Sequence, residues 1–120
     1  MSIKVIPHQA DRVIGLDING RIEAKDIQRV IPSIEKKLRQ KERLRIYVEV
    51  HNWSGISLGA FIQDLKFSLQ HYRDFEKEAI VSDRQWLESL AAISNTLFPS
   101  IEVKHFTLDE KDRALEWINN

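Results

Sequence analysis

Apolar and polar residues alternate over the first twenty positions of the chain, and a period of two is typical of β-strands. Ile3–Ile6 forms a short alternating segment that Pro7 ends, and Val13–Ile18 forms a second segment that is rich in β-branched residues. Asn19 and Gly20 follow, and both residue types tolerate a positive φ and break strands. The two segments are therefore predicted to pair as an antiparallel hairpin.

A spacing of three to four residues then predicts a first helix from about Ala24 to Gln40. Its apolar positions fall on one face: Ile27, Val30, Ile31, Ile34 and Leu38. Pro32 interrupts the pattern and leaves two interpretations open. The helix is kinked at Pro32, or it begins there with proline as its first residue.

Leu44–Val50 is the most strand-like run in the chain. Strand geometry places Ile46, Val48 and Val50 on one side and Tyr47, Glu49 and His51 on the other. A loop, Asn52–Gly55, leads to a second helix with either Ser54 or Ser57 as its N-cap. The buried stripe predicted for this helix consists of Leu58, Phe61, Ile62, Leu65, Leu69 and Tyr72.

The remainder of the chain repeats the same order of elements. Ala79–Val81 is a short apolar strand, and Ser82 and Asp83 precede a third helix that carries Trp86, Leu87, Leu90 and Ile93. A last strand follows over residues 101–106, and Thr107 with Glu110 forms a capping box that opens a final helix. The order β-β-α-β-α-β-α-β-α predicts one α/β domain over residues 1–120. Its sheet is mixed and mostly parallel, with about five strands and four helices.

Composition and charge narrow the functional classes. The 120 residues are 42% apolar and carry no net charge, which argues against nucleic acid as the partner because such binders usually have a basic excess. The basic run Lys36–Lys41 is interpreted as a helix end that complements the dipole. The absence of Cys excludes disulfides and thiolate chemistry. No apolar run approaches membrane-spanning length and no signal region is evident, so we expect a cytoplasmic protein.

An ordered series of short motifs resembles the SpoIIAA-like proteins, bacterial relatives of the STAS domains of anti-sigma-factor antagonists. The series runs through Gly20-Arg21-Ile22 with Asp26, Trp53-Ser54-Gly55, Phe61, Asp64-Leu65-Lys66-Phe67, Ala79-Ile80-Val81 with Asp83 and Trp86, and Phe106, and it closes with Ala114-Leu115-Glu116-Trp117-Ile118. The resemblance implies a STAS-like fold, also likened to the lipid-binding CRAL-TRIO fold, and no settled activity. STAS antagonists carry a phosphorylatable serine within Asp-Ser-Ser-Gly-Leu-Gly. The matching stretch here, residues 52–59, reads Asn-Trp-Ser-Gly-Ile-Ser-Leu-Gly and lacks the Asp-Ser-Ser order.

Residues 52–59 form the best candidate site. They follow a strand whose carboxyl end is where open α/β sheets place ligands, and they lead into a helix N-terminus that attracts anions. The alternative is an ordinary strand-to-helix connection, in which Trp53 packs over the sheet end and is not a lid over a ligand. The predicted ligand or partner surface consists of Glu49, His51, Trp53, Ser54, Gly55, Ser57, Phe61 and Asp64.

Catalytic and metal chemistry find little support in the sequence. Glu49 and His51 share a strand face, so we expect a hydrogen bond between them; a hydrolase would need Ser54 to converge on the pair. No two of the four histidines (His8, His51, His71 and His105) have helical metal-site spacing. The chain carries no nucleophile elbow, Walker loop or dinucleotide fingerprint. We therefore expect no metal and no cofactor.

These observations leave four hypotheses. The leading one is a non-enzymatic binding or regulatory domain whose protein partner contacts residues 54–59 and the second helix. The second is a site for a small apolar or lipid-like molecule between the second helix and the sheet, and an anion at the loop is a variant of it. The third is a hydrolase or transferase, and the fourth is a homo-oligomer formed through an open sheet edge.

Overall fold

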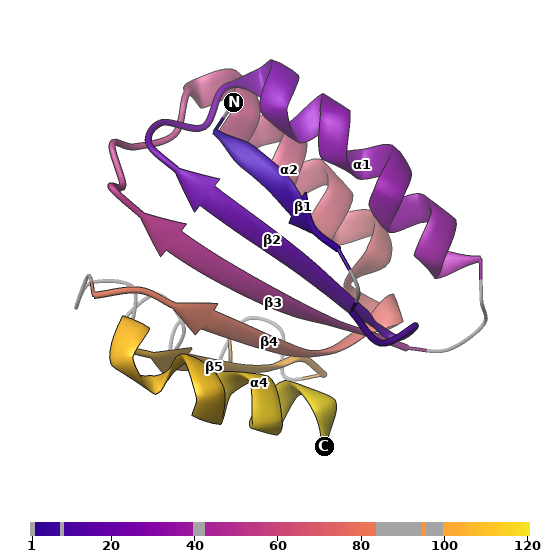
Figure 1. Ribbon diagram of the computed structural model, residues 1–120. Helices are drawn as coiled ribbons and strands as arrows, with labels where there is room; N and C mark the ends of the chain where they lie inside the picture. The colour runs from indigo at the N-terminus through magenta and orange to yellow at the C-terminus, as the bar shows by residue number, and fades with distance from the viewer. Residues whose placement is uncertain (1, 8, 40–42, 84–94, 96–99) are drawn as a thin grey trace.

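The computed structural model describes residues 2–7, 9–39, 43–83, 95 and 100–120. Its centre is a five-stranded sheet in the order β1-β2-β3-β4-β5 (Figure 1). β1 (Ile3–Ile6) pairs antiparallel with β2 (Val13–Asn19), while β3 (Leu44–His51), β4 (Phe75–Val81) and β5 (Glu102–Phe106) follow in parallel. The predicted hairpin and the mixed, mostly parallel sheet are thus confirmed.

Helices lie on both faces of this sheet. α1 (Ala24–Leu38) and α2 (Leu58–His71) cover one face, as successive right-handed crossovers require, and the 3-10 turn η1 (Tyr72–Asp74) extends α2. α4 (Lys111–Asn119) follows the 3-10 turn η2 (Leu108–Glu110) and packs on the opposite face (Figure 1). The described residues thus contain three of the four predicted helices. The predicted third helix, with Trp86, Leu87, Leu90 and Ile93, lies outside the described residues.

Pro32 lies inside α1, so the interpretation in which the helix begins at this residue is wrong. The helix begins at Ala24 because Glu23 and Asp26 form a capping box, in which the Glu23 N–H donates to Asp26 Oδ2 at 2.8 Å. Pro32 is exposed, and its ring removes one backbone donor from the helix. The packed face of α1, with Ile27, Val30 and Ile34 buried, outweighs that loss.

β4 is longer than the predicted Ala79–Val81 and begins at Phe75. Its first half contains Glu76, Lys77 and Glu78, and three consecutive charges hide the strand pattern in the sequence. The backbone nevertheless pairs with β3 and β5 along this half, so partners on both sides override the weak local preference.

Two apolar layers sandwich the sheet. The layer beneath α1 and α2 is formed by Ile3, Ile14, Ile22, Ile27, Val30, Ile34, Leu44, Ala60 and Phe75. The layer beneath α4 is formed by Val13, Tyr47, Ala79, Val81, Phe106, Ala114 and Ile118. Tyr47 and Val48 therefore point to opposite faces of β3, as the predicted alternation requires.

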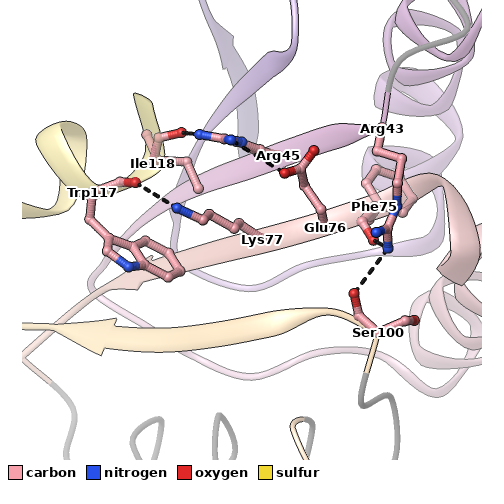
Figure 2. Close-up of polar contacts among 8 residues, drawn as sticks. All are labelled: Arg43, Arg45, Phe75, Glu76, Lys77, Ser100, Trp117 and Ile118. Carbon is pink, nitrogen blue, oxygen red and sulfur yellow. Dashed lines mark hydrogen bonds and ion pairs between the residues drawn. The ribbon is translucent and has the colours of Figure 1, made fainter. Parts of the chain in front are cut away.

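Two cationic side chains hold the carboxyl end of α4 against the sheet (Figure 2). Buried Arg45 donates to the Ile118 carbonyl at 2.8 Å and to Glu76 Oε2 at 3.3 Å. Lys77 donates to the Trp117 carbonyl at 3.3 Å and lies over the Trp117 ring. Cations at a helix C-terminus satisfy its unpaired carbonyls and its dipole, so this face of the sheet is fixed relative to α4.

Candidate functional site

The predicted site loop is tied to residues 20–22, which follow β2, by backbone hydrogen bonds. The Ser54 N–H donates to the Gly20 carbonyl at 3.1 Å, and the Ser57 N–H donates to the Ile22 carbonyl at 2.9 Å. In the other direction, the Ile22 N–H donates to the Gly55 carbonyl at 2.9 Å. Two of the loop N–H groups are therefore used within the fold and do not point at a ligand.

Positive φ angles shape this connection. Gly20 and Gly55 have φ angles of 90° and 108°, which side chains rarely tolerate, and Asn52 has a φ of 48°. A Cβ atom on Gly55 would lie 3.5 Å from an Arg21 guanidinium nitrogen. The turn chemistry thus accounts for both glycines without invoking a ligand.

The two loop serines have different roles. The Ser57 hydroxyl accepts the Ala60 N–H at 3.1 Å, so Ser57 and not Ser54 is the N-cap of α2. Ser54 is exposed, and its hydroxyl donates to the Asn52 carbonyl at 3.1 Å. Trp53 is half-buried and packs against a third buried cluster, which consists of Val48, Val50, Ile80 and Val103. This contact matches the interpretation of Trp53 as packing over the sheet end.

Glu49 is the centre of a polar cluster on the α4 side of the sheet. Its carboxylate accepts hydrogen bonds from the Tyr47 hydroxyl at 3.1 Å and contacts His51 Nε2 at 3.3 Å, as the sequence predicted for the Glu–His pair. Lys111 Nζ from α4 lies 3.1 Å from the same carboxylate. Burial acts to raise the pKa of Glu49, but the hydrogen bonds from Lys111, Tyr47 and His51 outweigh it and hold the pKa below its ordinary value.

The cluster does not extend to the third catalytic candidate. His51 contacts Glu49, whereas the Ser54 hydroxyl bonds to its own loop. The structure thus brings Glu49 and His51 together and shows no hydrogen bond between either of them and Ser54. Burial and the neighbouring Glu49 charge raise the pKa of Tyr47, so this phenol stays protonated.

A groove between α1 and α2, here called the α1–α2 groove, has a volume of about 380 Å³. It is lined by Gln28, Ile31, Glu35, Gln63, Lys66, Phe67, Gln70 and His71. The Phe67 and His71 rings lie 4.6 Å apart, and Ile31 and Phe67 are half-buried. Gln63 Oε1 is buried and accepts no hydrogen bond from the described residues. The groove therefore combines an apolar floor with one unsatisfied acceptor.

The two predicted site residues on α2 have different outcomes. Asp64 is exposed over the whole residue, yet neighbouring groups desolvate its carboxyl group and raise its pKa. The Phe61 side chain lies outside the described side chains.

Glu78 of β4 is a titratable residue that the sequence analysis did not single out. Burial, together with the Asp64 charge, raises the pKa of Glu78 to about 7.

The α4 side of β1 and β2 carries a second hollow, here called the sheet hollow, of about 360 Å³. Ser2, Lys4, Asp17 and Asn19 line it. Sequence reasoning missed these residues because only the strand register brings them together, and it missed Lys111 because only the position of α4 brings it to Glu49. In the described ranges, no group of three His, Cys, Asp or Glu side chains is placed to hold a metal ion. No described helix is long and apolar enough to cross a membrane.

The comparisons with known proteins agree with this fold. Residues 13–119 match the family model described as SpoIIAA-like. The chain belongs to the SpoIIAA-like family. A crystal structure described as an uncharacterized protein of the DUF3478 family with a SpoIIAA-like fold, from Shewanella loihica PV-4, is similar to this chain with a TM-score of 0.81 and 25% identity. The match covers 97% of this chain and 91% of that one. No curated protein matches the chain.

Proposed function

We propose that this SpoIIAA-like chain is a non-enzymatic binding or regulatory module whose protein partner docks in the α1–α2 groove. The observation that carries the proposal is the combination of half-buried Phe67 with the buried, unsatisfied Gln63 Oε1 on the same helix. A buried acceptor without a donor is unfavourable, and an apolar floor favours association. A docked segment that covers Phe67 removes its apolar surface from water. A hydrogen bond from the same segment to Gln63 satisfies the buried acceptor.

The candidate catalytic residues support this function over hydrolysis. Glu49 is ionised, and Tyr47, His51 and Lys111 already occupy most of the lone-pair positions of its carboxylate. A general base needs an accessible lone pair within hydrogen-bond reach of its substrate. The loop of residues 52–57 supports the binding role as a rigid neighbour of α2 because its backbone is bonded to residues 20–22.

Site-specific photo-crosslinking in the source cell tests the proposal. A photoreactive amino acid at exposed Gln70, on the rim of the α1–α2 groove, is compared with the same group at exposed Glu116 of α4, on the opposite face. We expect a discrete protein adduct from position 70 and none from position 116. The captured protein is then purified, and its affinity for the wild-type chain must be higher than its affinity for the variants Lys66→Glu and Phe67→Ala. Identical adducts from both positions, or none from either, would contradict the proposal.

A small apolar or lipid-like ligand in the same groove is the second candidate. The volume of about 380 Å³ lies within the range of small-molecule sites, and Ile31 and Phe67 provide an apolar floor. This candidate predicts that fatty acids or phospholipids raise the melting temperature of the wild-type chain but not that of Phe67→Ala. If no lipid shifts the wild-type melting temperature, the candidate fails while the protein-partner proposal stands.

A further inference from the structure

The α4 side of the sheet is only partly covered. α4 packs on β3, β4 and β5, and none of the described residues places a helix over β1 and β2 on this face. The sheet hollow lies on this uncovered part and is lined by Ser2, Lys4, Asp17 and Asn19. It therefore presents polar groups of two adjacent strands to solvent on the face opposite the α1–α2 groove.

Strand register places a row of charges across this face. Lys4 of β1 is the partner of Asp17 of β2, and Asp17 is the partner of Glu49 of β3. Residues paired in this way point to the same side of a sheet, so the three side chains are neighbours. Lys111 continues the row from α4 by its contact with Glu49.

The charges of this row differ in whether they have hydrogen-bonding or ion-pair partners. Glu49 has Lys111, Tyr47 and His51 as partners. Among the described residues, the side chains of Asp17 and Lys4 form no hydrogen bond or ion pair, and the Asp17 charge acts on Tyr47 only through space. Lys4 and Asp17 thus line one hollow as register partners of opposite charge, without a direct ion pair between their side chains.

We propose that the sheet hollow binds a small zwitterion of the α-amino-acid type. The ammonium group of the ligand pairs with Asp17 and its carboxylate pairs with Lys4, while the Asn19 amide and the Ser2 hydroxyl provide further hydrogen-bonding groups at the rim. A simple cation or anion satisfies only one of the two charges. A ligand that carries both within a few bonds satisfies the pair at once, which selects the zwitterion.

The affinity is expected to be weak because Lys4 is exposed and Asp17 is half-buried. Ion pairs near solvent contribute about 1 kcal/mol or less each, so a dissociation constant on the order of tens of mM is expected. The proposal is independent of the function proposed for the α1–α2 groove, which lies on the other face of the sheet.

An NMR titration of the whole chain in a buffer without zwitterions tests the inference. The probes are L-alanine, L-alanine amide, which lacks the carboxylate, and N-acetyl-L-alanine, which lacks the ammonium. L-alanine is expected to give saturable shifts at the backbone amides of Lys4, Asp17 and Asn19. The two half-ligands are expected to bind several-fold more weakly, because each leaves one charge unpaired.

Matched variants locate the site. Asp17→Asn and Lys4→Gln are expected to weaken L-alanine binding several-fold. Asp11→Asn and Lys25→Gln, which change the same charges at exposed positions outside the hollow, are expected to leave it unchanged. The spectrum of each variant reports whether it folds. Absence of saturable shifts with L-alanine, equal binding of either half-ligand, or equal binding by Asp17→Asn would overturn the inference.

Discussion

Glu49 Oε1 on β3 lies 3.1 Å from Lys111 Nζ in the first turn of α4. This ion pair joins the centre of the sheet to the last helix, and Tyr47 and His51 complete the shell around the carboxylate. Only 13% of the Glu49 side chain is exposed, so the pair is shielded from solvent on the sheet side. Its geometry assigns Glu49 a positioning role in the fold.

Glu49→Gln is expected to lower the free energy of unfolding at pH 7 by about 1 to 3 kcal/mol, because hydrogen bonds to a partly buried charge are lost. The pKa of Glu49 is lower in the folded state than its reference value of 4.5. The contribution of ionised Glu49 to the free energy of unfolding is therefore fully present above pH 4.5 and is lost as the pH falls through the folded-state pKa. Denaturant unfolding at several pH values measures this. A deficit that persists unchanged in acid would contradict the ion-pair account, and Glu116→Gln is the exposed control.

Glu78→Gln, in contrast to Glu49→Gln, is expected to raise the free energy of unfolding above neutral pH. The folded pKa of Glu78 is raised from 4.5 to about 7, so the folded state holds this proton more strongly than the unfolded state. Wild-type stability should fall between these two pH values and stay lower above them. The substitution should thus raise the free energy of unfolding by about 1 to 3 kcal/mol at pH 8, allowing for the partial exposure of Glu78. At pH 4 it should leave the free energy of unfolding almost unchanged. If exposed Glu102→Gln gives the same gain, the effect is not specific to the site of Glu78.

Arg45→Met tests the connection between the sheet and the end of α4. The variant loses the hydrogen bond to the Ile118 carbonyl and leaves Glu76 without its partner. We expect the free energy of unfolding to fall by about 1 to 3 kcal/mol. Relative to the wild type, hydrogen exchange should accelerate more in α4 than in α1. Arg113→Met, with 73% of its side chain exposed, should change stability by less than about 0.5 kcal/mol. Unchanged exchange in α4 would show that Arg45 does not hold this helix.

Ser57→Ala and Ser54→Ala separate the cap from the exposed hydroxyl. Ser57 caps α2 through Ala60, so its replacement should lower the free energy of unfolding by about 1 kcal/mol. The Ser54 hydroxyl bonds to the Asn52 carbonyl and the residue is exposed, so its replacement should be close to neutral. Thermal unfolding of the two variants measures the difference. Equal destabilisation would mean that the cap is misassigned.

Local patterns predicted the parts of the fold that depend on local chemistry. The alternation along β3 placed Glu49 beside His51, and the structure confirms their contact at 3.3 Å. The capping box of Thr107 and Glu110 is also confirmed, with the Thr107 N–H donating to Glu110 Oε1 at 2.9 Å. Each feature spans at most four residues, so the local sequence carries all the information that it needs.

Features that depend on distant segments were not predicted. Lys111 reaches Glu49 across 62 residues of sequence, and Asp17 faces Lys4 only because the hairpin has one register. The α1–α2 groove needs the relative placement of two helices, which no local pattern provides. The first half of β4 was missed because its charges are satisfied by tertiary partners such as the Trp117 carbonyl and Arg45.

Native mass spectrometry of gently purified chain, with the same sample then denatured, tests most directly whether the α1–α2 groove holds a protein partner. We predict that the wild type carries an additional polypeptide, and that Phe67→Glu loses it while Glu116→Gln retains it. If the bound polypeptide has the mass of the chain itself, the partner is a second copy. A small-molecule mass that denaturation releases would favour the ligand candidate, and identical spectra for the wild type and Phe67→Glu would contradict the role of the groove.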